Sequence, residues 1–127
     1  MKYKWTLTSK VLRSYLATAL WSSTKQTDDG NPLDYDYDAR DFSKEDLYRA
    51  KRDLIEFFEL AKELLDKEKE EGINEQQIAH DFWLTRNGHG AGFWDGMYIN
   101  GDALTEIAKK FKGIDIYVGD DNKIYFL

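Results

Sequence analysis

The sequence has no cysteine, a single proline among 127 residues, and apolar runs that are only a few residues long. Without cysteine there can be no disulfide, no thiolate nucleophile and no cysteine-ligated metal, a composition that fits a reducing cytosol. The short apolar runs and an N-terminus without an apolar signal core predict neither a membrane span nor an export signal. We therefore expect a cytoplasmic protein that does not associate with membranes.

Basic residues are also few relative to acidic ones. The chain has 18 Lys and Arg against 24 Asp and Glu, a formal net charge of -6. The excess is concentrated between residues 25 and 48, where eight acids stand against three bases, a net charge of -5. Because no basic stripe is available to neutralise phosphates, we expect no direct binding to nucleic acid. The charge favours a protein partner with a basic surface.

The apolar content is that of a folded chain. Hydrophobic residues make up 42% and aromatic residues 15% of the sequence, and a chain of this length can bury one core without disulfides or structural metals. We therefore expect one domain spanning residues 1–127. Its N-terminal residues 2–8 fit either a strand or a loose arm. Apolar residues at helical spacing, with residues that begin and end helices, predict four helices at about 9–21, 43–71, 74–82 and 100–112.

Two β-hairpins are expected after the third helix. Aromatic and β-compatible residues flank Asn87–Gly90, so residues 83–86 and 92–95 are predicted to pair, with glycines at the tip. Near the C-terminus, apolar residues alternate with Asp and Tyr over 114–118, and a Gly-Asp-Asp-Asn turn leads into 123–127. The predicted fold class is α+β, a single domain of about four helices packed on a small antiparallel sheet made of two hairpins.

The stretch from His80 to Asp95, here named the central segment, holds both histidines, two of the four tryptophans and three glycines. Two imidazoles with carboxylates can ligate zinc or iron, and a histidine near a carboxylate can exchange protons near neutral pH. The spacing matches no established metal motif, so the sequence predicts no metal site and no cofactor. The aromatic residues of this segment are expected to build core. Its candidate binding residues are His80, Asp81, Arg86, His89 and Asp95.

A second candidate is an acidic loop at about 22–42, which contains the only proline and an alternating Asp-Tyr pattern. Loops of this length inside a compact domain are usually either functional or disordered. Some of its acids, with Glu45, match ligand positions of an EF-hand loop, but Ala39 stands where that motif needs glycine. A solvated acidic loop is the simpler interpretation, and calcium binding remains open. The candidate binding residues are Asp34, Asp36, Asp38 and Asp41.

Four stretches carry a resemblance to a known family: Ala19–Thr24, Pro32–Asp34, His80–Asp95 (HDFWLTRNGHGAGFWD) and Asp115–Tyr125 (DIYVGDDNKIY). On these motifs the chain resembles a family of small uncharacterised proteins encoded by bacteriophages, prophages and plasmids, over nearly its whole length. The resemblance implies a mobile-element protein in the cytoplasm of a bacterial host, and it implies no reaction. Gly96 departs from the family pattern, in which a bulkier, often basic residue follows Phe-Trp-Asp.

No serine stands in a nucleophile-elbow motif, and no cysteine is present, so the sequence favours a protein that is not an enzyme. We expect an acidic interaction module of phage or mobile-element type that binds a basic host or phage protein surface, for example one that normally holds DNA. The alternative is a small enzyme or metal-dependent module. It requires convergence of four side chains in one pocket, namely His80, Asp81, His89 and Asp95.

Overall fold

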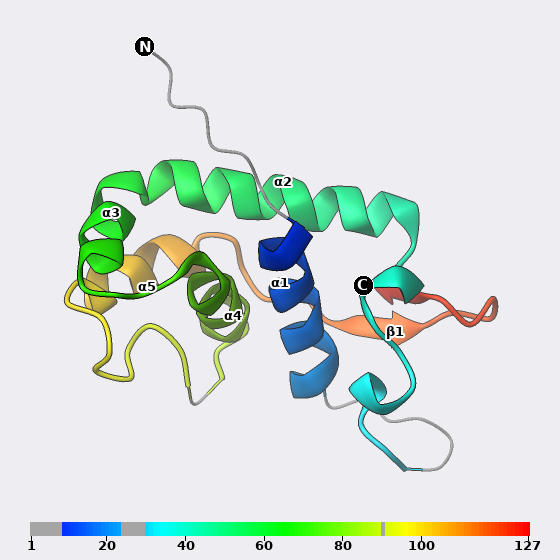
Figure 1. Ribbon diagram of the computed structural model, residues 1–127. Helices are drawn as coiled ribbons and strands as arrows, with labels where there is room; N and C mark the ends of the chain where they lie inside the picture. Colours follow the sequence, from blue (N-terminus) through cyan, green and yellow to red (C-terminus); the bar gives the residue numbers. More distant parts are fainter. Residues whose placement is uncertain (1–8, 24–29, 90) are drawn as a thin grey trace.

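The computed structural model describes residues 9–23, 30–89 and 91–127 (Figure 1). Among these residues there are five α-helices and one antiparallel pair of strands. The α+β class is confirmed, whereas the predicted four helices and two hairpins are wrong in number. The predicted segment at 2–8 lies outside the described residues. The elements are α1 (Ser9–Ser22), the 3-10 helices η1 (Leu33–Tyr35) and η2 (Ala39–Asp41), α2 (Lys44–Leu60), α3 (Lys62–Glu70), α4 (Glu75–Arg86), α5 (Gly101–Lys109), β1 (Ile116–Val118) and β2 (Ile124–Phe126).

The core is built around α4. In Figure 1, α2 runs along one side of the molecule, α1 and α4 pack side by side beneath it, and the strands lie on the other side of α1. The rings of Phe57 on α2 and Phe82 on α4 stack with centroids 4.2 Å apart. Phe93 extends the stack at 5.6 Å from Phe57. These fully buried rings join helices that are distant in sequence.

The predicted hairpin at 83–86 and 92–95 does not form, because residues 83–86 are the last turn of α4. Asn74 caps this helix as predicted, its side chain accepting a hydrogen bond from a backbone N–H of the first turn at 2.8 Å. Between residues 78 and 86 every residue except His80 is buried. Because α4 is packed on nearly all sides, its sequence does not show separate polar and apolar faces at helical spacing. The tertiary contacts of its aromatic residues outweigh their β propensity.

The helix predicted over 43–71 is two helices that meet at Ala61. Ser43 caps the first one, as its sequence position indicates, but the chain turns sharply between α2 and α3 (Figure 1). Neither proline nor glycine marks this turn, and Ala61 provides no side-chain cap. The apolar spacing alone therefore indicates one continuous helix. The turn places Leu65 and Glu68 in the interior.

The C-terminal hairpin is confirmed. β1 and β2 pair in antiparallel fashion with Ile116 opposite Phe126. The Ser43 N–H donates to the Ile124 carbonyl at 2.9 Å, and the Phe126 N–H donates to the buried Asp46 carboxylate at 3.0 Å. These bonds fix the hairpin to the beginning of α2.

The acidic loop is more regular than predicted. Its residues 24–29 lie outside the described part, but η1 and η2 order the remainder. Leu33 is fully buried, and η1 packs on α1. Asp38 and Asp41 cap η2 reciprocally, each side chain accepting a backbone N–H. Trp21, near the end of α1, is 57% exposed.

Candidate functional site

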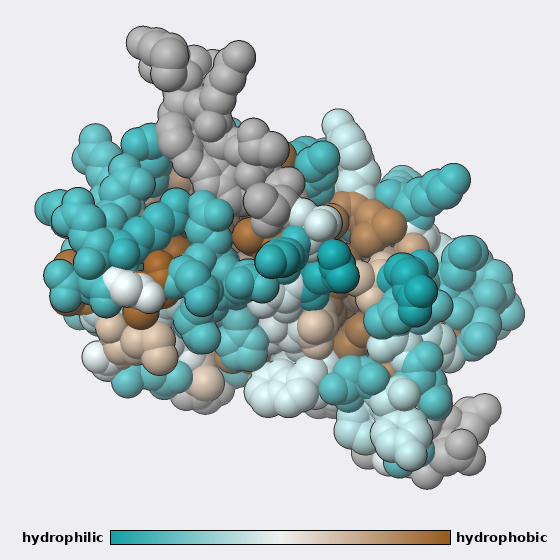
Figure 2. All heavy atoms as spheres, in the orientation of Figure 1, coloured by the Kyte–Doolittle hydropathy of each residue, from teal (hydrophilic) through white to brown (hydrophobic). Residues whose placement is uncertain are grey.

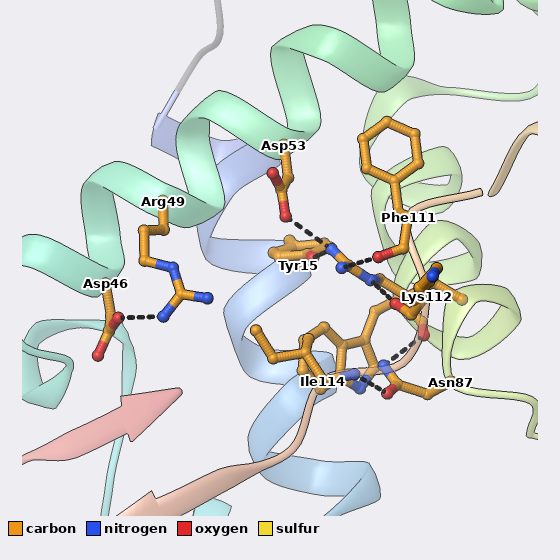
Figure 3. Close-up of polar contacts among 10 residues, drawn as sticks. Tyr15, Asp46, Arg49, Asp53, Asn87, Phe111, Lys112 and Ile114 are labelled. Carbon is orange, nitrogen blue, oxygen red and sulfur yellow. Dashed lines mark hydrogen bonds and ion pairs between the residues drawn. The ribbon is translucent and has the colours of Figure 1, made fainter. Parts of the chain in front are cut away.

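Arg86 lies at the polar centre of the core. Its guanidinium donates to the Tyr15 hydroxyl at 3.0 Å and to the Asp53 carboxylate at 2.9 Å. It also donates to the carbonyls of Phe111 and Lys112, each at 2.8 Å. Figure 3 shows these partners gathered from α1, α2 and the chain after α5. Because the side chain is only 4% exposed and each of its three nitrogens donates at least one hydrogen bond within the protein, Arg86 holds the fold together.

Asp81 also has internal partners. Its carboxylate accepts a hydrogen bond from the Tyr98 hydroxyl at 2.6 Å and from the Gln77 side-chain amide at 2.9 Å. Burial and the hydrogen bond to Asp81 raise the pKa of Tyr98 above its ordinary value. Asp81 itself is 5% exposed. The pair anchors the chain after α4 to that helix and presents no carboxylate to solvent.

The remaining ionisable residues of the central segment do not converge. His80 Nδ1 lies 2.7 Å from Thr18 Oγ1, whereas His89 lines a different hollow. Asp95 accepts a hydrogen bond from the Gly92 N–H at 3.1 Å within a turn. The described residues contain no group of three or more His, Asp or Glu that could hold a metal ion. The pocket that an enzyme or metal-dependent module requires is not found among them.

Gly92 allows the chain to pack closely against Thr85 and does not form the tip of a hairpin. A Cβ on this residue would overlap Thr85 Oγ1, and its φ of +151° disfavours any other residue. The Thr85 hydroxyl accepts the Phe93 N–H at 3.0 Å inside the core. Phe93 is buried as predicted, while Trp94 is 37% exposed and is not a core residue. The central segment is thus mainly a structural junction.

Glu68 is a buried acid that sequence patterns miss. It lies in a charged run at the end of α3, yet it is fully buried. Its carboxylate accepts the N–H groups of Ile99 and Asn100 at 3.0 and 2.6 Å. This places a negative charge at the beginning of α5, where backbone N–H groups lack helical partners. The role of Glu68 is therefore to fix α5 against α3.

The fold brings two acidic segments together. The Tyr37 hydroxyl donates to the side-chain oxygen of Asn122 at 2.6 Å, across 85 positions of sequence. This contact places the acidic loop beside the β1–β2 turn, whose two aspartates the sequence pattern does not assign to the site. The six aspartates of these two segments form what we call the acidic face: Asp34, Asp36, Asp38, Asp41, Asp120 and Asp121.

Three of the six aspartates in the acidic face already have hydrogen-bond or ion-pair partners within the protein. Asp38 binds Arg40 at 2.7 Å, and this hydrogen bond lowers the pKa of the Asp38 carboxyl. Asp41 and Asp121 accept backbone N–H groups of their own turns. The other three carboxylates are exposed and have no hydrogen bond or ion pair with any described residue: Asp34, Asp36 and Asp120. These three are free to bind a partner.

Figure 2 shows the hydrophilic character of this end of the molecule. The lobes at the right and lower right, where Figure 1 has the β1–β2 turn and the η1–η2 segment, are teal or pale. Exposed aromatic rings are set among the acids, with Tyr35 73% and Tyr117 37% exposed. Exposed tyrosines surrounded by polar residues are common in protein-binding surfaces.

The chain matches no protein-family model, no curated protein and no solved structure. A functional assignment therefore rests on the geometry of the described residues. Their fold and surface define a small α+β protein with one acidic, tyrosine-bearing face. In the described part of the chain, no helix has both the length and the apolar character that crossing a bilayer requires.

Proposed function

We propose that this protein is a non-enzymatic interaction module whose acidic face binds a basic surface on a host or phage protein. The observation that carries the proposal is the Tyr37–Asn122 hydrogen bond, because it gathers acids from two distant segments onto one surface. Three of these carboxylates have no internal partner and can pair with Lys or Arg. Attraction between complementary charges speeds association and makes binding weaken as salt is added.

The arrangement of the central segment supports the same proposal. Arg86 and Asp81 are buried, and their hydrogen bonds go to the protein itself. Buried ionisable groups whose hydrogen bonds go to the protein itself stabilise its fold. We therefore place partner binding on the surface, at the exposed carboxylates that have no internal partner.

On the strength of the resemblance, we also propose that the protein acts in the cytoplasm of a bacterium that carries a phage, prophage or plasmid. A surface that normally holds DNA is a suitable target there, because it is basic and because carboxylates offer it the same sign of charge as phosphates. Such a partner would release this protein when DNA is added.

Affinity capture tests the proposed function with two variants of equal charge. The face variant carries Asp34→Asn, Asp36→Asn and Asp120→Asn. The control variant removes three exposed acids of α3 and its end: Glu63→Gln, Glu70→Gln and Glu71→Gln. Since each variant loses three negative charges from a net charge of -6, both carry -3.

Each tagged protein is incubated with bacterial lysate and washed with rising salt, and the eluted proteins are identified by mass spectrometry. We expect a protein with a basic surface to be retained by the wild type and the control variant, released by salt, and lost from the face variant. Retention of the same protein by the face variant contradicts the proposal. So does the absence of any salt-released partner.

A further inference from the structure

We infer that a hollow between α1, α4 and η1 is a guanidinium-binding pocket that takes one arginine side chain of the basic partner. The inference rests on the proposed function for the identity of that partner. The hollow, here named the Trp21 pocket, has a volume of about 300 Å³, at the lower end of the range for small-ligand sites. Six described residues line it: Ser14, Ala17, Thr18, Trp21, Asp34 and His80.

The hydrogen bonds of Thr18 determine which nitrogen of His80 carries a proton. Thr18 Oγ1 lies 2.8 Å from the Ser14 carbonyl oxygen and 2.7 Å from His80 Nδ1. A hydroxyl has one proton and a carbonyl can only accept. Both bonds therefore form together only if Thr18 donates to Ser14 and the His80 Nδ1–H donates to Thr18. In the neutral ring, Nε2 is then an acceptor, and it has no partner among the described residues.

Two further groups of the pocket favour a cation. The exposed indole of Trp21 lies with its ring centroid 5.8 Å from that of His80, and an indole face attracts cations. Asp34 supplies a carboxylate without an internal partner. None of the six lining residues carries a permanent positive charge. An aromatic face, a carboxylate and an imidazole acceptor together select against anions.

Arginine fits these groups better than lysine does. A planar guanidinium can stack on an indole while its edge donates two hydrogen bonds to a carboxylate and another to an imidazole nitrogen. An ammonium group is a compact, strongly hydrated charge and does not combine these contacts. A divalent metal would find only one imidazole and one carboxylate among the lining residues, fewer than zinc sites provide.

Proton NMR of the histidines tests the pocket without a protein partner. His80 and His89 are the only histidines, and a His89→Gln variant assigns their Hε1 signals. The protein is titrated with ethylguanidinium chloride at about pH 8, where an ordinary imidazole is neutral. Ethylammonium chloride at matched ionic strength is the control ligand. We expect a saturable shift of the His80 signal with ethylguanidinium only, while the His89 signal stays in place.

Substitution of the indole supplies a second readout. In Trp21→Leu we expect the affinity for ethylguanidinium to fall about two- to five-fold, the range that an exposed cation–π contact provides. Tyr48→Leu is the matched control, because it removes a similarly exposed ring from α2, outside the pocket. It should leave the affinity unchanged.

Equal responses of both histidines to both salts would overturn the pocket, and so would an unchanged affinity in Trp21→Leu. Failure of the proposed function has a different signature. If capture of a basic partner depends on the acidic face but the His80 signal does not respond to ethylguanidinium, the result supports the acidic face as a binding surface and contradicts the guanidinium pocket. If the titration succeeds while the face variant captures the same proteins as the wild type, the pocket binds a guanidinium but does not take an arginine of the partner, because that variant also lacks the Asp34 carboxylate of the pocket.

Discussion

The guanidinium of Arg86 joins four parts of the chain at one point. It links the end of α4 to Tyr15 on α1, to Asp53 on α2 and to the backbone after α5. The rings of Phe82 and Phe111 lie 5.5 and 5.7 Å from its Cζ atom. A charged group is tolerated in such surroundings only because its N–H donors have partners. The stability of the core is therefore tied to this one side chain.

Replacing Arg86 tests that dependence. Arg86→Met leaves the Asp53 carboxylate without its partner, and we expect the free energy of unfolding to fall by about 3 kcal/mol or more. Arg86→Lys should lose most of the same stability, because an ammonium cannot reach all of the acceptors. Arg40→Met is the matched control, since its ion pair with Asp38 is exposed and should contribute nothing measurable. Urea denaturation measures each variant, and equal losses at the two arginines would contradict this role.

The buried phenol of Tyr15 predicts sensitivity to alkali. Burial, partly offset by Arg86, raises the pKa of Tyr15 to about 12, whereas the phenol ionises near pH 10 in an unfolded chain. The stabilisation from the neutral phenol is therefore complete below about pH 10 and is lost as the pH rises toward 12.

Urea denaturation at several alkaline pH values measures this loss. We expect the free energy of unfolding to fall over the window by up to about 2 kcal/mol more in the wild type than in Tyr15→Phe, which has no phenol to ionise. The two proteins losing stability in parallel would show that Tyr15 is not the group responsible.

Among the elements, α4 shows where sequence patterns stop being informative. The helices α1 and α5 and the C-terminal hairpin were predictable because their apolar residues recur with a regular period. The central helix is buried on nearly all sides, so no polar face marks its period, and the glycines after it suggest a hairpin that does not exist. The turn at Ala61 has no local cause in the sequence. It follows from long-range contacts such as those of Glu68 with the beginning of α5.

The chain that follows α4 packs closely against that helix at Gly92. Gly92→Ala should cost about 2 kcal/mol or more, because the added Cβ overlaps the Thr85 hydroxyl and the backbone there is strained for alanine. In Gly113→Ala the new Cβ would lie 3.4 Å from Asn87, with no positive φ, and the cost should stay below about 1 kcal/mol. Thermal unfolding compares the two, and equal melting temperatures would refute the close packing at Gly92.

Across the whole molecule, polar groups divide into two sets with different tasks. Those at the centre, such as Arg86 and Asp81, are buried and bonded to the protein, while the three carboxylates of the acidic face without an internal partner are exposed. The sequence indicates an acidic loop but cannot show that the β1–β2 turn extends it, because that depends on one contact between Tyr37 and Asn122. Nor can it show that Asp34 and His80 line one pocket, since they come from different elements.

The dissociation constant of the captured partner, measured for the face variant and the control variant, shows whether the acidic face binds that partner. The two variants have the same net charge and differ only in where the acids were removed. We predict that the face variant binds about ten-fold or more weakly than the wild type at low ionic strength, with a smaller difference in high salt. The control variant should stay within about two-fold of the wild type. Equal affinities of the two variants would contradict an acidic face that binds its partner.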